Sequence, residues 1–219
     1  MSKRATNVHM RRSKGKARRP GRPRSESADR AILRAALDVF VERGIDGASI
    51  EEIAEKAGVA RTTLYRRWSS KEKLIARAIA DARGDPEQDA VSDRVPLTRL
   101  PRVLADALAK MFTRPEFQKV AARLIGSIPT CPELMETYWD SNLAPRRRMI
   151  GGLLNTAKVE GLIRDDADPH LPIDPLGGAI IHHALLRPGR RSGEEMRAYL
   201  LSVLHALGLD GKPHPSKSR

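Results

Sequence analysis

The 219-residue sequence lacks long hydrophobic runs, contains one cysteine, and has only 4% aromatic residues. No stretch approaches the roughly 18 apolar residues that a membrane-spanning helix needs, and no apolar run follows the basic N-terminus as it would in a secretory signal. A single thiol, Cys131, excludes an intramolecular disulfide and a zinc site of four cysteines. We therefore expect a globular protein of the reducing cytoplasm that is long enough to bury a proper core.

Positive charge is present in excess and is concentrated at the N-terminus. The net charge is +13, and residues 1–24 contain ten basic residues and no acidic residue. Residues 25–84, by contrast, contain 11 basic and 10 acidic residues. The N-terminal arm has only Val8 and Met10 as sizeable apolar residues, so it cannot bury enough surface to offset its ordering entropy and should be disordered when free. The charge favours a polyanion as partner.

The end of this arm has the sequence Arg18-Arg19-Pro20-Gly21-Arg22-Pro23-Arg24. Each proline disfavours helix at the residue before it, so the run should be extended and narrow. Such a ribbon fits a narrow A·T-rich minor groove, whose potential attracts arginine, and the run resembles an AT-hook. Arg19, Arg22 and Arg24 are thus candidate DNA contacts. A solubilising tail is the alternative interpretation of the arm.

After the arm, the pattern is that of an all-α protein, without the sustained alternation of strands. Apolar residues at helical spacing, among them Ile32, Leu33 and Phe40, predict a first helix that ends at Gly44. Its start could be capped by a serine just after the arm. The helix would present one apolar face to a core.

Two short helices and a longer one are predicted next. Ser49-Ile50-Glu51-Glu52 has the pattern of a capping box, and the helix that it begins should stop at Gly58. A second short helix is expected over 61–68. Ser70 can cap a further helix that ends at Gly84, where a polar connection begins.

The remaining helices are longer and more apolar. They are expected over about 97–113, from Pro115 onwards, over 132–160 with a kink or break at Pro145, over 174–186 and over 192–207. The predicted organisation is a basic arm (1–24), an N-terminal three-helix helix-turn-helix DNA-binding domain (25–84), a C-terminal helical domain for ligand binding and dimerisation (85–209) and a flexible tail (210–219).

The two short helices have the anatomy of a helix-turn-helix. They are joined by Ala57-Gly58-Val59, where glycine permits the tight turn. Between Arg61 and Lys73 lie five basic residues and one acidic residue, an excess that suits a face next to phosphates. Three packed helices without a nucleic-acid partner are the alternative.

Residues 28–79 resemble the DNA-binding domain of the TetR (tetracycline repressor-like) family of transcriptional regulators. The resemblance rests on Ala54-x-x-Ala57-Gly58-Val59, on Thr63-Leu64-Tyr65-Arg66-Arg67-Trp68, and on Ser70-Lys71-Glu72. It implies a regulator that binds near-palindromic operators as a two-fold dimer. Ala60 departs from the family pattern, which often has a small hydroxyl residue there, so one capping or phosphate contact lacks its usual residue.

Carried over by position, the resemblance assigns base contacts to the front of the second short helix. Arg61, Thr62 and Thr63 are the candidates. An arginine there could bond guanine O6 and N7, a contact worth about 1–3 kcal/mol of discrimination. Either threonine could meet a thymine methyl group or a phosphate.

The resemblance also assigns contacts to the DNA backbone. Tyr65 corresponds to the phosphate-binding tyrosine of the family, and Lys71 is expected to bind phosphate at the start of the next helix. Arg66 and Arg67 could touch the backbone or simply be solvated, and Ser49 could reach a phosphate in addition to its capping role. Leu64 and Trp68 are expected in the core.

For the C-terminal part, the resemblance implies a ligand cavity among the middle helices and a dimer bundle built from 174–187 and 192–207. An unknown small-molecule effector would shift the fourth helix, which requires different affinities for two states. The low aromatic content favours an apolar ligand of modest size. The candidate lining residues, each of which ordinary core packing also explains, are Met111, Phe112, Phe117, Leu124, Ile128, Met135, Tyr138, Trp139, Met149 and Leu153.

Three other features have both a structural and a functional interpretation. The adjacent His182 and His183 point to different helix faces and cannot chelate a metal together. With His170 and His205 they could form a metal or pH site between subunits, but ordinary histidines are favoured. Cys131 could sense redox state but is more simply a small apolar residue. Arg146-Arg147-Arg148 could be a solvated face or receive an anionic ligand.

No catalytic motif is present: there is no phosphate-binding loop, no Gly-x-Ser-x-Gly and no His-Glu-x-x-His. We therefore expect no enzyme, no cofactor and no metal. The favoured hypothesis is a cytoplasmic, nucleoid-associated homodimer that binds double-stranded DNA, a repressor released by its effector. The alternatives are a ligand-independent architectural protein with A·T preference and an enzyme on a helical scaffold.

Deleting residues 1–24 should reduce the slope of log affinity against log salt concentration, because fewer basic residues release fewer counterions from DNA. Titrations of a duplex at several salt concentrations measure this slope. An unchanged slope would contradict a DNA-binding arm and favour the solubilising tail.

Overall fold

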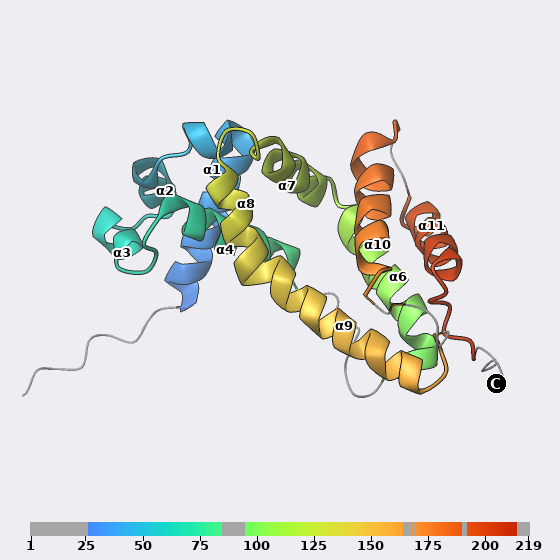
Figure 1. Cartoon of the computed structure of the whole chain (residues 1–219). Helices are drawn as coiled ribbons and strands as arrows, with labels where there is room; N and C mark the ends of the chain where they lie inside the picture. Colours follow the sequence, from blue (N-terminus) through green and yellow to red (C-terminus); the bar gives the residue numbers. More distant parts are fainter. Residues whose placement is uncertain (1–25, 85–94, 164–167, 169, 190–191, 214–219) are drawn as a thin grey trace, which may run out of the picture.

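The computed structural model describes residues 26–84, 95–163, 168, 170–189 and 192–213, and every regular element in these ranges is a helix (Figure 1). The all-α prediction is confirmed. The arm, with Arg19, Arg22 and Arg24, lies outside the described residues. None of the described helices is long and apolar enough to cross a membrane.

Helix α1 (Glu26–Gly47) carries the apolar face that its sequence predicts. Ile32, Val39 and Phe40 are completely buried. Gly44 has φ 73° and ψ −177°, a conformation that favours glycine, and it interrupts the helical geometry where the sequence predicts an end. The chain then makes one more turn as far as Gly47.

Helix α2 (Ile50–Lys56) begins with half of the predicted capping box. The Ser49 hydroxyl accepts a hydrogen bond from the Glu52 amide at 3.1 Å. The Glu52 carboxylate, however, forms an ion pair with Arg43 of α1 at 2.8 Å instead of completing the box. Arg43, from the neighbouring helix, therefore binds the carboxylate that the sequence pattern assigned to the cap.

Helix α3 (Arg61–Tyr65) is shorter than predicted. The amides of Arg67 and Trp68 both donate to the Leu64 carbonyl, each at 2.9 Å, which tightens the chain into a turn. Leu64 is 1% exposed and Trp68 packs against the same apolar cluster. The helix thus ends three residues before Trp68, which packs against the core from the turn that follows.

Helix α4 (Lys71–Arg83) is capped as predicted, since the Ser70 hydroxyl accepts from the Lys73 amide at 3.2 Å. It packs against α1 on one side and against α8 (Pro132–Tyr138) on another. One apolar cluster consequently extends from α1–α4 into α7 (Pro115–Gly126) and α8, through Val120, Leu124, Leu134 and Tyr138. The division of the chain after residue 84 stays a prediction.

A second cluster lies at the other end of the molecule (Figure 1). It joins α6 (Leu100–Phe112), which follows a short turn of helix at Leu97–Arg99, to α11 (Gly193–Ala206) and α10 (Ile173–Ile181). Helix α10 continues as the wider π-helical turn His182–Leu186.

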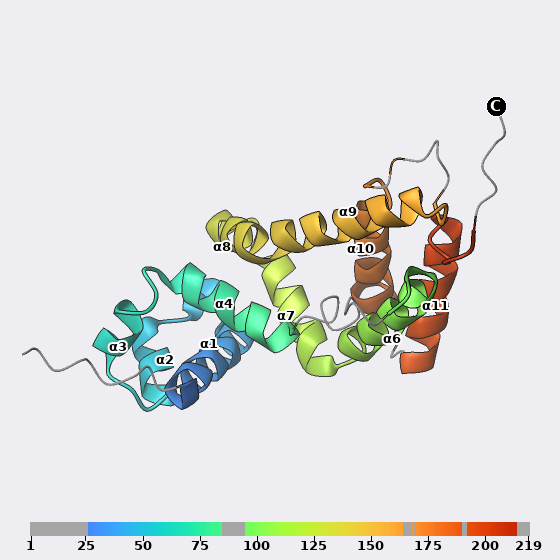
Figure 2. The ribbon, with the colours of Figure 1, turned by 90° about the horizontal axis from the view of Figure 1, so that it is seen from below.

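Pro145 neither interrupts the path of the chain nor produces a loop. Helix α8 continues through a π-helical turn, Trp139–Leu143, into α9 (Ala144–Val159), and Figure 2 shows α8 and α9 end to end along one side of the molecule. The Ala144 amide donates to the Trp139 carbonyl, five residues back. The widened turn accommodates a proline that has no N–H to donate and whose ring would clash with a regular turn.

Ser192 forms a complete capping box with Glu195. Replacing Ser192 with alanine should lower the free energy of unfolding by about 1 kcal/mol, because the Glu195 amide loses its acceptor. Thermal unfolding followed by circular dichroism measures the change. The control is Ser202→Ala on the exposed side of α11, where alanine favours the helix and no loss is expected. Equal losses in the two variants would contradict a capping role.

Candidate nucleic-acid interface and adjoining cavity

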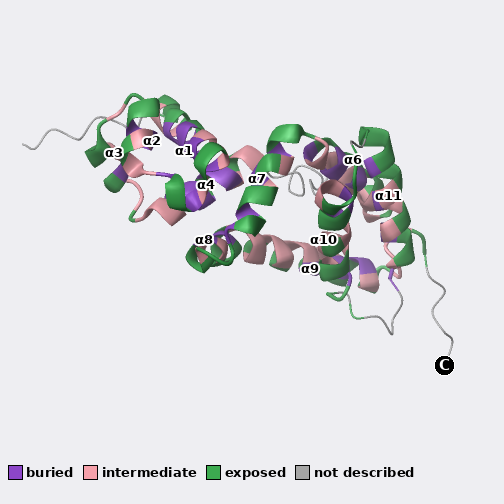
Figure 3. Cartoon of the chain, turned by 90° about the horizontal axis from the view of Figure 1, so that it is seen from above, coloured by how far each residue is buried: buried purple, intermediate pink, exposed green. Residues whose placement is uncertain are grey.

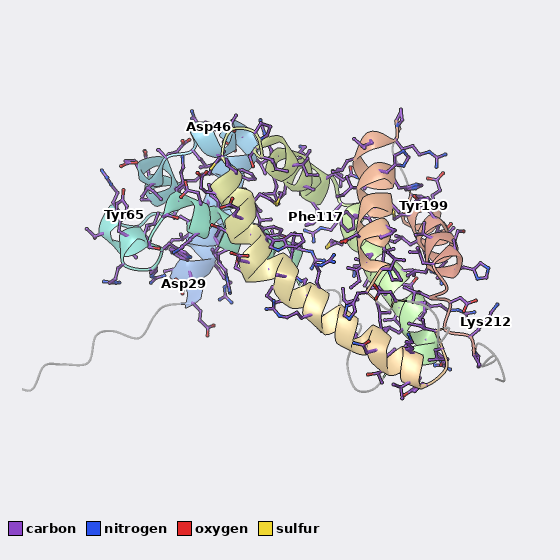
Figure 4. All side chains as sticks on the ribbon, in the orientation of Figure 1. Asp29, Asp46, Tyr65, Phe117, Tyr199 and Lys212 are labelled. Atoms are coloured by element: carbon purple, nitrogen blue, oxygen red, sulfur yellow. The ribbon has the colours of Figure 1, made fainter. Side chains whose placement is uncertain are left out.

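The front of α3 forms an exposed polar face at one end of the molecule. Leu64 anchors the helix in the core, whereas Arg61, Thr62 and Arg66 are exposed and Tyr65 is 54% exposed (Figure 3). Figure 4 shows Tyr65 on α3, at the end of the molecule farthest from α11. These side chains can reach a partner without unfolding any part of the core.

The predicted base-reading residues share the first turn of α3. Thr63 is half-buried, and Thr62 is fully available to a partner. Ala60, the N-cap, makes no side-chain capping bond, as its departure from the family pattern predicts. The first amides of α3 are therefore without the side-chain acceptor that a serine or threonine would offer.

Arg61 is held in place by its neighbours. Its Nη2 lies 2.6 Å from Glu51 Oε1 and 3.4 Å from the Tyr65 hydroxyl. The hydrogen bond to Tyr65 and the charge of Glu51 raise the pKa of the Arg61 guanidinium. All three side chains are exposed, so a guanine or phosphate could displace the carboxylate at little cost.

Arg67 does not share this face. Its side chain is only 11% exposed and forms an ion pair with Asp29 in the first turn of α1. The sequence placed Arg67 either on the DNA backbone or in solvent, but the structure turns it inward, where it fixes the end of α3 to α1. Arg66, by contrast, remains exposed and available.

Lys71 also has intramolecular partners. Its Nζ donates to the carbonyls of Ile45 and Ala48, at 2.6 and 3.0 Å. These oxygens lie in the last turn of α1 and in the link to α2, so the lysine joins the start of α4 to the corner between α1 and α2. Two of its three N–H groups are thus used within the protein. Ser49, which was also predicted to reach a phosphate, uses its hydroxyl to cap α2.

An apolar cavity of about 460 Å³ lies next to the end of α4. Its walls come from α4, α6, α7, α8, α9, α10 and α11, together with the π-helical turn Trp139–Leu143. Figure 4 labels one lining residue, Phe117, in the middle of the molecule. Seven of the predicted residues line it: Phe112, Phe117, Leu124, Met135, Tyr138, Trp139 and Leu153.

Three predicted lining residues lie elsewhere. Met111 is buried in the cluster between α6 and α11, so its side chain belongs to the core. Ile128 is 43% exposed in the turn after α7. Met149 is half-buried on α9 and does not line the cavity, whereas its neighbour Ile150 does. For Met111 and Met149 helical phase, which the apolar pattern leaves ambiguous, decides the outcome, whereas Ile128 lies beyond the end of α7.

Sequence reasoning missed the apolar walls from α4 and α10, and those from α6 other than Phe112; the missed residues include Ile79, Leu104 and Ile180. Their apolar stripes predict burial, but the sequence cannot distinguish a residue that faces a cavity from one that faces another side chain. It did single out Arg146 and Arg147, which line the cavity, and Arg148, which is exposed.

The described histidines and Cys131 were the other candidates from the sequence. No group of three or more histidine, cysteine or acidic side chains is placed to hold a metal ion in the described part of the chain. His183 is buried and stacks on Tyr199, with ring centroids 4.0 Å apart, whereas His182 is exposed. Burial raises the pKa of the Cys131 thiol, which keeps it protonated and disfavours a reactive thiolate.

Comparison with known proteins agrees with this geometry at both ends of the chain. A family model described as "Bacterial regulatory proteins, tetR family" matches residues 32–78, and one described as "Tetracyclin repressor-like, C-terminal domain" matches residues 101–203. YdeS, an uncharacterized HTH-type transcriptional regulator of Bacillus subtilis (strain 168), is 32% identical over 172 residues, which cover 76% of this chain and 82% of YdeS. The chain belongs to the TetR family of transcriptional regulators.

More distant similarities agree with this assignment. The HTH-type transcriptional regulator RutR of Escherichia coli O157:H7 is 27% identical over 76% of this chain and 79% of its own. The crystal structure of a TetR-like transcriptional regulator from Rhodococcus sp. RHA1 matches with a TM-score of 0.59 and 23% identity, over 87% of this chain and all of the other. In this TetR-family regulator the DNA-binding helix-turn-helix is therefore α2 and α3, and the family is one of DNA-binding regulators rather than enzymes.

Replacing Lys71 with methionine should destabilise this TetR-family protein by about 1–3 kcal/mol, because the carbonyls of Ile45 and Ala48 lose their donor. Urea unfolding measures the loss. The matched control is Lys73→Met, which removes an exposed bond to Ser69 and should cost less than about 0.5 kcal/mol. Two equally small losses would mean that the carbonyl contacts of Lys71 do not support the fold.

Proposed function

We propose that this TetR-family regulator is a repressor that binds a palindromic operator as a homodimer and releases it when a small molecule fills the cavity. One observation carries the proposal: α4 begins beside the helix-turn-helix and ends at the cavity. A ligand at one end of a single packed helix can therefore bias the position of α3 at the other. For release, the ligand must bind the two arrangements with different affinities.

In the proposed complex, α3 enters the major groove. Arg61, Thr62 and Thr63 read base edges because they occupy the first turn of the helix. Tyr65 and Arg66, both exposed, bind the DNA backbone. The basic arm adds salt-dependent contacts in the flanking minor groove through Arg19, Arg22 and Arg24.

Three further residues act less directly. Arg67 and Lys71 position α3 and α4 through Asp29 and the corner between α1 and α2, as their contacts support. Lys71 has one N–H left for a phosphate, and Ser49 can receive a backbone phosphate beside its capping bond.

The proposed dimer uses the last two helices. Apolar side chains are exposed on α10 and the turn after it, notably Ile181 and Leu186. A two-fold axis through this surface buries the same residues of both copies and directs two α3 helices to half-sites about 34–36 Å apart.

The experiment that tests the function is selection of bound sequences from a random duplex pool at physiological salt. A two-fold palindrome is the expected result. Enrichment of A·T-rich tracts without symmetry would contradict operator reading and favour the architectural hypothesis, in which the arm dominates binding. Band-shift stoichiometry on the selected duplex gives the number of chains bound.

Arg61→Ala should relax the preference for one base in each half-site by about 1–3 kcal/mol, whereas Tyr65→Phe should weaken binding to all duplexes alike. Affinities for the selected operator and its single-base variants separate the two effects. Arg148→Ala, which removes an exposed arginine from α9, is the control for loss of charge. A uniform loss in Arg61→Ala would remove this residue from the base-reading set.

A further inference from the structure

A second, smaller cavity adjoins the main cavity towards the C-terminal end of α9. Its volume is about 60 Å³, against about 460 Å³ for the main cavity, and every described residue that lines it is apolar or glycine. The residues that line both cavities are all leucines. These six residues, the leucine wall, are Leu100, Leu104, Leu153, Leu154, Leu204 and Leu209. The leucine wall therefore separates the two spaces.

The two cavities follow one another along α9. Arg146, Ile150 and Leu154 line the main cavity at intervals of about one helical turn, and Ala157, which is nearly one turn farther on, lines the smaller cavity. The helical rise places Arg146 and Leu154 about 12 Å apart along the axis, with Ala157 about 4.5 Å beyond. The lining of the main cavity thus extends along most of α9 and ends at the leucine wall.

The last turn of α11 places one residue of this wall. Gly208, which follows the helix, has φ 73°, and its amide donates to the His205 carbonyl at 3.0 Å. The Leu209 amide donates to the Leu204 carbonyl at 2.8 Å. These two bonds form a Schellman motif, in which a left-handed glycine turns the next residue back onto the helix. Leu204 and Leu209 consequently both line the two cavities.

Further contacts hold Leu209 in the wall. Among the described residues, it is the one side chain that packs both on the cluster of α6, α10 and α11 and on a third cluster, formed by Leu154, Ala157, Leu162 and Ile163. The carboxylate of the next residue, Asp210, lies 3.0 Å from His205 Nδ1 and accepts from the Lys212 amide at 3.0 Å. The chain after α11 is thus tied back to the helix on both sides of the motif.

We propose that the effector is an elongated apolar molecule that lies along α9, and that Leu209 limits its length by closing the main cavity against the smaller one. This inference rests on the proposed function of the cavity as an effector site. Each methylene group that leaves water for the cavity strengthens binding, whereas one that meets a closed wall adds strain instead. Truncating Leu209 should join the two cavities and admit a longer chain.

Calorimetric titration of the full-length protein tests the limit. The probes are the straight-chain alcohols from 1-hexanol to 1-dodecanol, which are uncharged and differ only in apolar length. The affinity should rise about fourfold with each added methylene group up to a limiting length and then stop rising. No binding of any alcohol, or an affinity that rises steadily through 1-dodecanol, would overturn the inference.

Variants of the wall locate the limit. Leu209→Ala should admit a longer alcohol, so the first alcohol beyond the natural limit should bind about fourfold more tightly than it does to the natural chain. Leu209→Val gives the same comparison with a smaller truncation if the alanine variant does not fold. The matched control is Leu207→Ala, a half-buried leucine that lines neither cavity and should keep the natural limit. An unchanged limit in both Leu209 variants, or an equal shift in Leu207→Ala, would overturn the inference.

Refilling the smaller cavity from α9 gives a second test. Ala157 lines this cavity and not the main one. Adding Ala157→Val to Leu209→Ala should therefore shorten the limit again, because the space that the truncation opened is occupied. A double variant with the same limit as Leu209→Ala would contradict a chain that extends past the wall into the smaller cavity.

Release of DNA separates this inference from the function on which it rests. Fluorescence anisotropy of the selected operator duplex is measured with each alcohol, for the natural chain and for Leu209→Ala. Alcohols that bind with a shifted limit but release no DNA would contradict the ligand-released repressor and leave the role of Leu209 standing. Release with the same dependence on chain length in both proteins would overturn that role and support the repressor.

Discussion

Helix α4 is buried between two groups of helices, and the arrangement of the rest of the chain depends on it. Leu74, Ile75 and Ile79 are almost completely buried, and the helix packs on both α1 and α8. Its first residue, Lys71, joins it to the corner between α1 and α2, and Arg146 of α9 bonds its C-cap. The position of α3 is consequently coupled through close packing to helices more than 60 residues away in sequence.

Much of the fold could be predicted because its determinants are local. The spacing of apolar residues locates the helices, and Gly44, Gly84 and Pro115 mark where helices end or begin. The Ser70 and Ser192 caps bind backbone amides only three residues away. The helix-turn-helix was accessible for the same reason, since its motif is continuous in sequence. Seven cavity residues were found because apolar residues of the middle helices must face either the core or the cavity.

What the sequence could not supply depends on contacts between distant segments. Arg67 is a basic residue in a basic segment, as is typical of a DNA contact. Its ion pair with Asp29, 38 positions earlier, nevertheless turns it inward. The Glu52 carboxylate forms an ion pair with Arg43 instead of completing the capping box. The wall of the cavity includes Arg83, Arg146 and Asp174 from three helices, and no spacing rule joins those positions.

The π-helical turn at Trp139–Leu143 affects how the continuous helix formed by α8 and α9 should be compared with the same helix in relatives. An extra residue within a helical turn advances the phase of everything downstream by about 100°. Leu134 and Tyr138, before the turn, pack in the cluster shared with α1–α4, and Tyr138 lines the cavity together with Ile150 and Leu153, which follow the turn. One uninterrupted α-helix would direct the residues after Leu143 to a different face. A one-residue gap at this turn in an aligned relative would thus signal a rotated set of cavity residues rather than a shortened loop.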